Sequence, residues 1–145
     1  MIGIACDHGG YELKEQIKKF LENLNYQVID YGTNSLESVD YPKYAYKLAK
    51  AVKNKEVEKG IVICKTGIGV SITCNKIKGI RCAKVDNKEE AILTRSHNDA
   101  NILALSSKNK DALEITKQFI ETPFSNEERH IKRIKMIEEI EKNEC

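Results

Sequence analysis

The sequence predicts an α/β fold: a three-layer sandwich with a five-stranded, mainly parallel, Rossmann-like sheet between two layers of helices. Two observations lead to this prediction. Short runs of residues typical of buried strands alternate with stretches of helical periodicity along the whole chain. The 145 residues also contain no linker, low-complexity tract or internal repeat, so we expect residues 1–145 to form one domain.

The predicted elements follow one another in regular alternation. Strands are expected at 2–6, 26–31, 60–64, 80–85 and 101–105. Helices are expected at about 13–24, 42–53, 70–76, 88–96, 110–121 and 126–142. Pro42 stands in the first turn of its helix, where a missing N–H is tolerated. Right-handed crossovers through these helices should leave the strands parallel, with helices on both faces of the sheet.

The last predicted helix has an unusual spacing of apolar residues. Ile131, Ile134, Ile137 and Ile140 recur every three residues, so their stripe drifts around the helix axis. A drifting stripe that follows a complete sheet pattern is more typical of a contact with a second subunit than of core packing. We therefore expect this C-terminal helix to reach a partner subunit in a homodimer or a homotetramer.

Composition excludes several classes of partner. Charged residues make up 32% of the chain and apolar residues 41%, as in soluble globular proteins. The formal net charge of +2 is too small to predict binding to nucleic acid or to a membrane. No apolar run approaches the ~20 residues that span a bilayer, and the N-terminus lacks the basic segment of a signal peptide. We expect a cytoplasmic protein.

The five cysteines, Cys6, Cys64, Cys74, Cys82 and Cys145, form no CxxC pair and no spacing suited to zinc. Their odd number and a reducing compartment argue against disulfides. We expect Cys74 and Cys82 to pack as small core residues. Because the three histidines are also scattered and no carboxylate pair stands out, we expect no metal.

Cys64 differs from the other cysteines because a glycine-rich turn follows it. The buried strand 60–64 ends in this cysteine, and the turn 65–69 leads into a helix. Open α/β sheets bind their ligands at the carboxyl ends of the strands. The N–H groups of such a turn and helix start form an anion site, and a thiol beside an anion site favours its thiolate form. The sequence predicts a reactive sulfur next to a site for negative charge.

Three further groups of residues have both a chemical and a structural interpretation. Asp7 and His8, followed by two glycines, face a sugar-like ligand or serve as a helix N-cap and a surface histidine. His97 is an acid–base group, with an ordinary pKa of about 6.5, or a helix C-terminal cap. Arg129 and Arg133 lie four residues apart on one helix face, where they bind phosphate, with added positive charge from His130 and Lys132, or pair with Glu128 or Glu138.

Several fragments, taken together, resemble one known family. They are Cys6-Asp-His-Gly-Gly-Tyr-Glu-Leu-Lys14, Val28-Ile-Asp-Tyr-Gly-Thr33, Val39-Asp-Tyr-Pro42, Gly60-Ile-Val-Ile-Cys-Lys-Thr-Gly-Ile-Gly69, Ser71-Ile72 with Asn75-Lys76, Gly79-Ile-Arg81, His97-Asn-Asp-Ala-Asn101, and Arg129-His130 with Arg133. The chain resembles the ribose/galactose phosphate isomerase family, which holds the type B ribose-5-phosphate isomerases and the galactose-6-phosphate isomerase subunits. Each fragment alone is weak, but jointly they are specific and cover essentially the whole chain.

The resemblance implies an isomerase that interconverts ribose 5-phosphate and ribulose 5-phosphate through an enediolate, with no metal or organic cofactor. Cys64 would be the base that moves a proton between C1 and C2, while the N–H groups of residues 66–69 would hold the enediolate oxygen. The other implied roles are ring opening by Asp7, His97 and Thr66, binding of sugar hydroxyls by Tyr41 and Asn98, phosphate binding by His8, Arg129 and Arg133, and substrate contacts from Lys65, Gly67, Ile68 and Gly69. The family's site lies between subunits, so His97 would serve the neighbour's Cys64.

Three segments depart from the family pattern. Lys65 replaces a glycine directly after the implied base. If the turn needs a positive φ there, lysine costs about 1 kcal/mol; otherwise its ammonium favours the thiolate or extends into water. Ser106 replaces a glycine after the fifth strand, and residues 126–128 replace glycines before the Arg-His pair.

Other functions remain open at this point. A hexose phosphate such as allose or galactose 6-phosphate is an alternative substrate, although His97 and Tyr41 favour a pentose. A phosphocysteine carrier of a sugar phosphotransferase system also places a cysteine between a strand and a glycine-rich turn, but it has no need for the histidines and the arginine pair. A catalytically inactive binding subunit would not need both Cys64 and His97.

Overall fold

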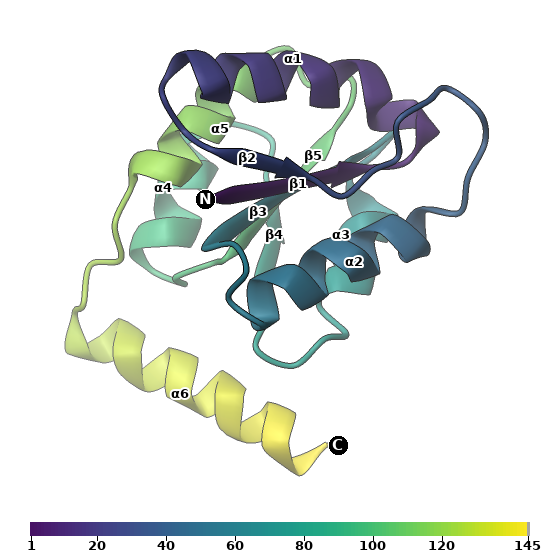
Figure 1. Ribbon diagram of the computed structural model, residues 1–145. Coiled ribbons are helices and arrows are strands. Elements are labelled where there is room, and N and C mark those ends of the chain that lie inside the picture. Colours follow the sequence, from purple (N-terminus) through teal and green to yellow (C-terminus); the bar gives the residue numbers. More distant parts are fainter. Residues whose placement is uncertain (145) are drawn as a thin grey trace.

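The computed structural model describes residues 1–144 and shows a parallel sheet between two layers of helices (Figure 1). The strands are β1 (Ile2–Cys6), β2 (Val28–Asp30), β3 (Lys59–Cys64), β4 (Cys82–Lys84) and β5 (Ile102–Ser106). The helices are a short 3-10 turn η1 (His8–Gly10), α1 (Tyr11–Asn23), α2 (Tyr41–Lys53), α3 (Ile68–Cys74), α4 (Lys88–Ser96), α5 (Ala112–Glu121) and α6 (Glu128–Asn143). The three-layer α/β prediction is confirmed, and Cys145 lies outside the described residues.

The sheet has the strand order β2-β1-β3-β5-β4, and every pair is parallel. Cys6 lies beside Ile63, and Cys64 lies beside Ser106, so β1, β3 and β5 end close together. From β1 the chain crosses to β2 on one side and then to β3 on the other. At such a reversal the loops after the two central strands diverge, which leaves room for a ligand at their carboxyl ends.

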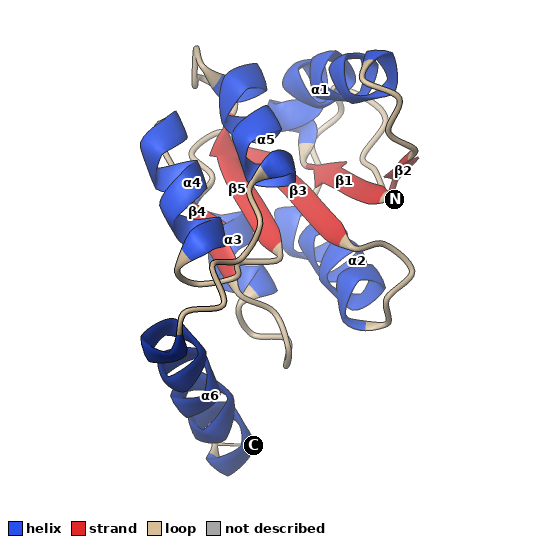
Figure 2. Ribbon diagram, turned by 90° about the vertical axis from the view of Figure 1, so that its left-hand side faces the viewer, coloured by secondary structure: helices blue, strands red, loops and turns tan. Residues whose placement is uncertain are grey.

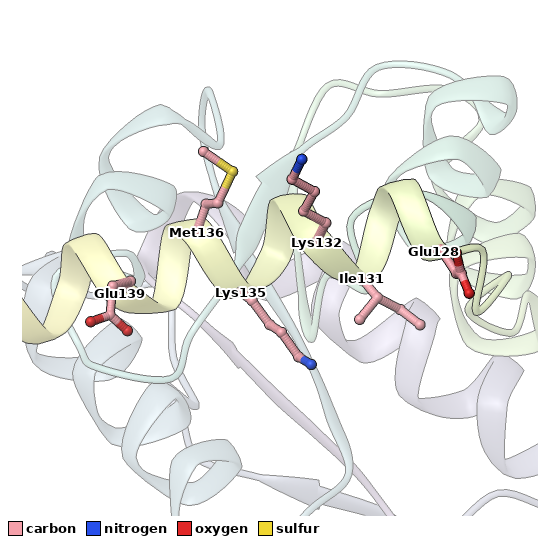
Figure 3. A pocket seen from close by; sticks show the side chains of 6 residues that line it. All are labelled: Glu128, Ile131, Lys132, Lys135, Met136 and Glu139. Atoms are coloured by element: carbon pink, nitrogen blue, oxygen red, sulfur yellow. The ribbon is translucent and has the colours of Figure 1, made fainter.

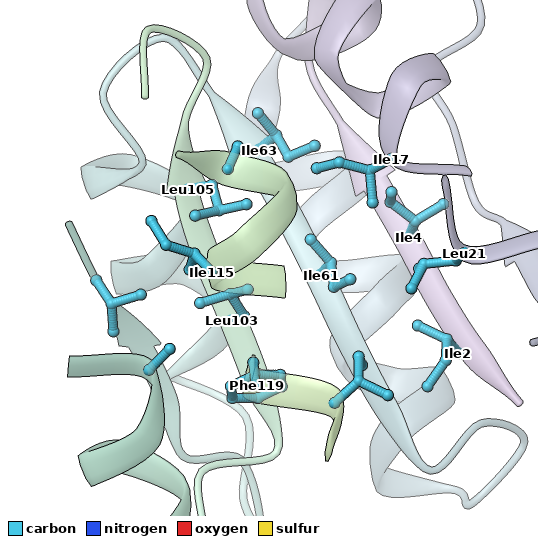
Figure 4. Close-up of a cluster of buried hydrophobic side chains, with 14 of the residues drawn as sticks. Ile2, Ile4, Ile17, Leu21, Ile61, Ile63, Leu103, Leu105, Ile115 and Phe119 are labelled. Carbon is cyan, nitrogen blue, oxygen red and sulfur yellow. The ribbon is translucent and has the colours of Figure 1, made fainter. Parts of the chain in front are cut away.

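The central strands are buried on both faces, as parallel strands are when helices cover them. One face packs against α1, α4 and α5, where Ile4, Ile61 and Leu103 meet Ile17 and Phe119 (Figure 4). The other face packs against α2 and α3, and its cluster includes Leu48, Val62, Val70, Cys64 and Cys74. Cys74 is fully buried, as predicted, whereas Cys82 is only half-buried at the start of an edge strand.

A fully buried lysine joins α1 to the end of β2. Lys14 lies on the same stripe of α1 as Ile17, with no side-chain exposure. Its Nζ donates to Asp30 Oδ2 at 2.6 Å, to the Thr33 carbonyl at 2.7 Å and to Asn34 Oδ1 at 2.7 Å. Burial acts to raise the pKa of Asp30, but hydrogen bonds from Lys14, Lys18 and the Gly32 N–H hold it below its ordinary value. The network fixes the start of the 31–40 loop.

Helix α6 stands apart from the sheet and its covering helices (Figures 1 and 2). An extended segment leads to it from α5, and the Ser125 N–H donates to the Ser96 carbonyl at 3.1 Å. Of the predicted isoleucine stripe, Ile134 is buried, but Ile137 and Ile140 are 47% and 62% exposed. The helix is therefore confirmed, and its contact with a partner stays a prediction.

Within residues 1–144, the longest and most apolar helices still fall short of what a membrane crossing requires.

We predict that Lys14→Met lowers the free energy of unfolding by about 3–5 kcal/mol, because it removes a buried ammonium from the Asp30 carboxylate and leaves the Thr33 carbonyl and Asn34 Oδ1 without this donor. Lys18→Met is the matched control. Lys18 also binds Asp30, at 2.9 Å, but its side chain is 25% exposed, so water replaces it and the loss stays below about 1 kcal/mol. Urea unfolding measures both variants, and equal losses would contradict the burial argument.

Candidate active site

The turn from β3 to α3 holds the sulfur of Cys64 against backbone N–H groups. Cys64 is only 6% exposed, and its Sγ accepts the Gly67 N–H at 3.1 Å. Thr66 Oγ1 accepts the next donor, the Ile68 N–H, also at 3.1 Å. Gly69, the second residue of α3, has an N–H with no acceptor inside the helix. The turn therefore supplies one donor to the sulfur and leaves the Gly69 N–H without an acceptor inside the helix.

Gly67 is the residue that allows this tight turn. Its φ is +78°, in the left-handed region. A Cβ at this position would lie 2.9 Å from the Leu105 carbonyl carbon on the neighbouring strand. Because Gly67 caps the helix, α3 starts at Ile68 rather than at the predicted Val70.

Lys65 is not strained in this turn. It is not among the residues with positive φ in the described chain, so the condition for a conformational cost is not met. Ser106 Oγ donates to the Lys65 carbonyl at 2.7 Å, and the Ser107 N–H donates to the Cys64 carbonyl at 2.9 Å. Ser106 therefore helps to fix the backbone of Lys65. Both residues stand at positions where the sequence analysis expected a glycine. The Lys65 side chain is exposed, and within residues 1–144 it has no ion-pair partner.

The turn after β1 lies directly beside the Cys64 turn. The Asp7 N–H donates to the Ile63 carbonyl at 3.2 Å, and Asp7 Oδ1 accepts the Gly10 N–H at 3.2 Å. Asp7 is therefore the predicted N-cap, although its 8% exposure leaves a carboxylate oxygen at the surface of the site. The two turns are in contact at Gly9, where a Cβ would lie at a van der Waals distance of 3.5 Å from the Lys65 nitrogen.

His8 has its ring orientation set by the 31–40 loop. Its Nδ1 accepts the Val39 N–H at 3.1 Å. An imidazole nitrogen that accepts a hydrogen bond carries no proton, so the neutral ring bears its proton on Nε2. His8 therefore presents a donor to its surroundings.

Tyr41 covers the start of α3 from the other side. The residue is 40% exposed at the N-terminus of α2. A Cβ on Gly69 would lie 2.6 Å from Tyr41 Cζ, so the ring packs directly over this glycine. We call Asp7, His8, Tyr41 and residues 64–69 the cysteine half-site.

The remaining predicted site residues form a second group, the histidine half-site: His97, Asn98, Arg129 and Arg133. His97 caps α4, as predicted for its structural interpretation, with its N–H donating to the Leu93 carbonyl at 2.8 Å. Its imidazole stacks on that of His130 in α6, with ring centroids 4.2 Å apart and planes 16° apart. Asn98, Arg129 and Arg133 are exposed around this pair.

Within one chain, the cysteine half-site lies at the carboxyl ends of the strands and the histidine half-site lies toward their amino ends. Ile102, which follows His97 by five residues, is level with Gly60. Gly60 lies four residues before Cys64 on β3, a distance of about 13 Å along a strand. One chain therefore does not bring His97 to its own Cys64.

The glutamate partners expected for the arginines differ from those observed. Arg129 lies 3.8 Å from Glu127 rather than pairing with Glu128, and Glu138 lies 3.8 Å from Arg81 rather than binding Arg133. The Arg129 and Glu127 side chains are 61% and 53% exposed, and such exposed pairs contribute little stability. Both guanidinium groups are therefore available to an anionic ligand.

Cys6 and Cys82 have environments that disfavour a thiolate. Burial raises the pKa of Cys6 to about 12. A hydrogen bond with Cys74, together with burial, raises the pKa of Cys82 well above its ordinary value. In the described part of the chain, no group of three or more histidine, cysteine or acidic side chains is arranged to hold a metal ion.

Sequence reasoning missed three residues that shape the site: Lys14, Val39 and His130. Lys14 falls on the apolar stripe of α1 with Ile17 and Leu21, a position that signals a buried cation. His130 was recognised only as added positive charge, yet it is 5% exposed and faces the body of the fold. The Val39 N–H leaves no sequence signal, because any residue but proline supplies it.

A family model described as Ribose/Galactose Isomerase matches residues 2–137. This chain belongs to that family. Ribose-5-phosphate isomerase B of Escherichia coli (strain K12) is 41% identical over 143 residues, which cover 97% of this chain and 95% of that protein. The expected membership of the ribose/galactose isomerase family is thereby confirmed.

Solved structures of other family members match the fold over nearly its full length. Ribose-5-phosphate isomerase B of Clostridium thermocellum is 48% identical, with a TM-score of 0.96 and coverage of 99% of both chains. The Mycoplasma genitalium enzyme, solved with bound ribulose-5-phosphate, is 38% identical, with a TM-score of 0.92 and coverage of 97% of this chain and 95% of that one.

We predict that Gly67→Ala in this ribose/galactose isomerase family member destabilises the fold more than Gly79→Ala does. Both glycines have positive φ, +78° and +86°, but a Cβ on Gly79 meets no atom within 4 Å. Gly79→Ala therefore has only the conformational cost of about 1–2 kcal/mol, while Gly67→Ala adds a backbone collision with Leu105. Urea unfolding compares the two, and similar values would show that the Cys64 turn relaxes freely.

Proposed function

We propose that this protein interconverts ribose 5-phosphate and ribulose 5-phosphate through an enediolate, without a cofactor. The observation that carries the proposal is the Cys64 sulfur at the carboxyl end of a central strand, 3.1 Å from the Gly67 N–H. It is supported by the family and by the relative that was solved with ribulose-5-phosphate.

In the proposed reaction the Cys64 thiolate removes the proton from C2 of the open-chain aldose. The electron pair of the C–H bond forms the C1–C2 double bond, and the carbonyl pair moves onto the C1 oxygen. The O2 proton then passes to the C1 oxygen, and the Cys64 thiol returns the abstracted proton to C1, which gives the ketose and restores the thiolate. Because the Gly67 and Ile68 N–H groups are bonded to Cys64 and Thr66 in the free chain, the Thr66 and Gly69 N–H groups would hold the developing oxyanion.

The remaining groups would bind the rest of the sugar phosphate. His8, with its proton on Nε2, would hold the phosphate together with Arg129 and Arg133. Tyr41 and Asn98 would bind hydroxyl groups. Asp7, Thr66 and His97 would open the furanose ring. Lys65, the residue after the proposed base Cys64, would add a positive charge near the reacting end of the substrate.

We further propose that a homodimer completes the site, with the histidine half-site of one chain meeting the cysteine half-site of its partner. The separation of the two half-sites within one chain supports this arrangement. So does an open surface of α6, which six side chains of that helix line and which a partner could cover (Figure 3). Those residues are Glu128, Ile131, Lys132, Lys135, Met136 and Glu139.

We also propose that residues 1–145 form one domain and that the protein is cytoplasmic. The single sheet that includes every described strand supports the first proposal. The second is supported by four free cysteines among residues 1–144, a state typical of reducing compartments.

Cys64→Ala should lower kcat for ribose 5-phosphate by about 10²–10⁴-fold, the usual contribution of a general base, while leaving the fold intact. Cys82→Ala is the matched control and should keep its activity, because Cys82 lies at the start of β4. Assays of both variants on ribose 5-phosphate, allose 6-phosphate and galactose 6-phosphate test the base and the substrate together. Unchanged turnover in Cys64→Ala would refute the role of Cys64 as the base. A higher activity on a hexose phosphate than on ribose 5-phosphate would make the hexose phosphate the proposed substrate instead.

Mixing Cys64→Ala with His97→Gln, each inactive alone, should restore activity. In a two-fold dimer with shared sites, each mixed dimer has one site that carries both changes and one that carries neither. Random exchange of subunits therefore gives about a quarter of the wild-type activity. Mixtures with no recovered activity, although sedimentation shows that subunits have exchanged, would place both residues in one chain's site.

A further inference from the structure

His130 is not one of the predicted site residues, but it contacts the histidine half-site. It lies on α6 with Arg129 and Arg133, and its ring stacks on that of His97. It is buried, with 5% exposure, while its neighbours Arg129 and Arg133 on α6 are exposed. Its ring lies parallel to that of His97, with the centroids 4.2 Å apart. The stack therefore joins the helix that carries the guanidinium groups to the helix that ends at His97.

The charged groups around His130 favour a neutral ring. His97 faces it from the end of α4, and Glu127, Arg129 and Arg133 surround it on α6. Burial, then His97, Arg129 and Arg133, lower the pKa of His130, and only Glu127 acts in the opposite direction. Glu127 Oε2 lies 3.4 Å from His130 Nε2, yet this buried nitrogen makes no hydrogen bond within residues 1–144. At neutral pH the ring is an aromatic platform rather than a cation.

Other contacts between α6 and the body of the fold lie before the helix or beyond the stack. The Ser125 N–H donates to the Ser96 carbonyl before α6 begins. Beyond the stack, Arg81 lies 3.8 Å from the 54% exposed Glu138 side chain and donates to the Asn98 carbonyl, and the Gly79 N–H donates to Glu141 Oε1. The two imidazoles are the direct contact between the His97 ring and the part of α6 that carries Arg129 and Arg133.

We propose that His130 is a positioning residue, which holds the His97 imidazole at a fixed distance from Arg129 and Arg133. The inference rests on the proposed isomerase function, in which His97 transfers a proton and the arginines hold the phosphate of the same substrate. Because the His130 ring holds His97 relative to the two arginines, binding of the phosphate at one end of the substrate also places the other end correctly against His97. Loss of the ring would leave the phosphate bound and the proton-transfer group misplaced.

The stack itself is tested by proton NMR of the imidazole C2–H resonances, which are few because the chain has three histidines. Protonation of one stacked imidazole opposes protonation of the other, so His97→Gln should raise the pKa of His130. The control Glu138→Gln should leave it unchanged. If the pKa of His130 is the same in His97→Gln as in wild type, the stack is overturned, whether or not the protein is an isomerase.

Kinetics test the positioning role. His130→Ala should lower kcat about tenfold or more while KM changes less than about threefold, because small misplacement of a catalytic group has large effects on rate. His130→Phe, which keeps a flat stacking ring without a proton, should restore kcat to within about threefold of wild type. Equal losses in both variants, or a loss confined to KM, would overturn the proposal. If wild type lacks isomerase activity, the proposed function fails instead, and the NMR result stands separately.

Discussion

The parallel pairing of β3 between β1 and β5 is the constraint on which the rest of the structure depends. All five strands run in one direction. Every turn that follows a strand therefore lies at the carboxyl ends of the strands, and every turn that precedes a strand lies at their amino ends. Asp7 and Cys64 follow strands, whereas His97 precedes one. This topology therefore places the two kinds of residue at different ends of the strands within one chain. It supports the proposal that two subunits share each site.

The parts of the fold with local causes could be predicted from the sequence. Strand and helix order followed from periodicity, and the Cys64 turn followed from residue types that act on their immediate neighbours. The place of β5 between β3 and β4 could not be predicted, because strand pairing joins residues far apart in the chain. The sequence also left open whether the turn requires a positive φ at Lys65; the structure places the positive φ on Gly67, two residues later.

Burial of polar side chains marks the other limit of sequence reasoning. Lysine is rarely found fully buried and histidine is intermediate, yet Lys14 and His130 are both buried beside the candidate site. Lys14 fixes the loop whose Val39 N–H orients His8, and His130 stacks on His97. Helical spacing places each of them on the inner face of its helix, with Ile17 and with Ile134. A polar residue on an apolar stripe was therefore the available signal, and it indicated organisation of the site rather than a defect in the core.

The drifting isoleucine stripe of α6 follows from the number of surfaces that this helix presents. At 100° per residue, four isoleucines spaced by three residues cover about 180° of the helix. His130 and Ile134 occupy the side that faces the body, and Arg129 and Arg133 lie together on one flank. Lys132 and Met136, two of the residues drawn in Figure 3, lie on the side opposite Ile134. A helix that packed on the core alone would keep its apolar residues within one narrow stripe. Spreading them over half the circumference suits a helix that docks on its own chain, presents cations to a ligand and keeps an apolar surface for a neighbour.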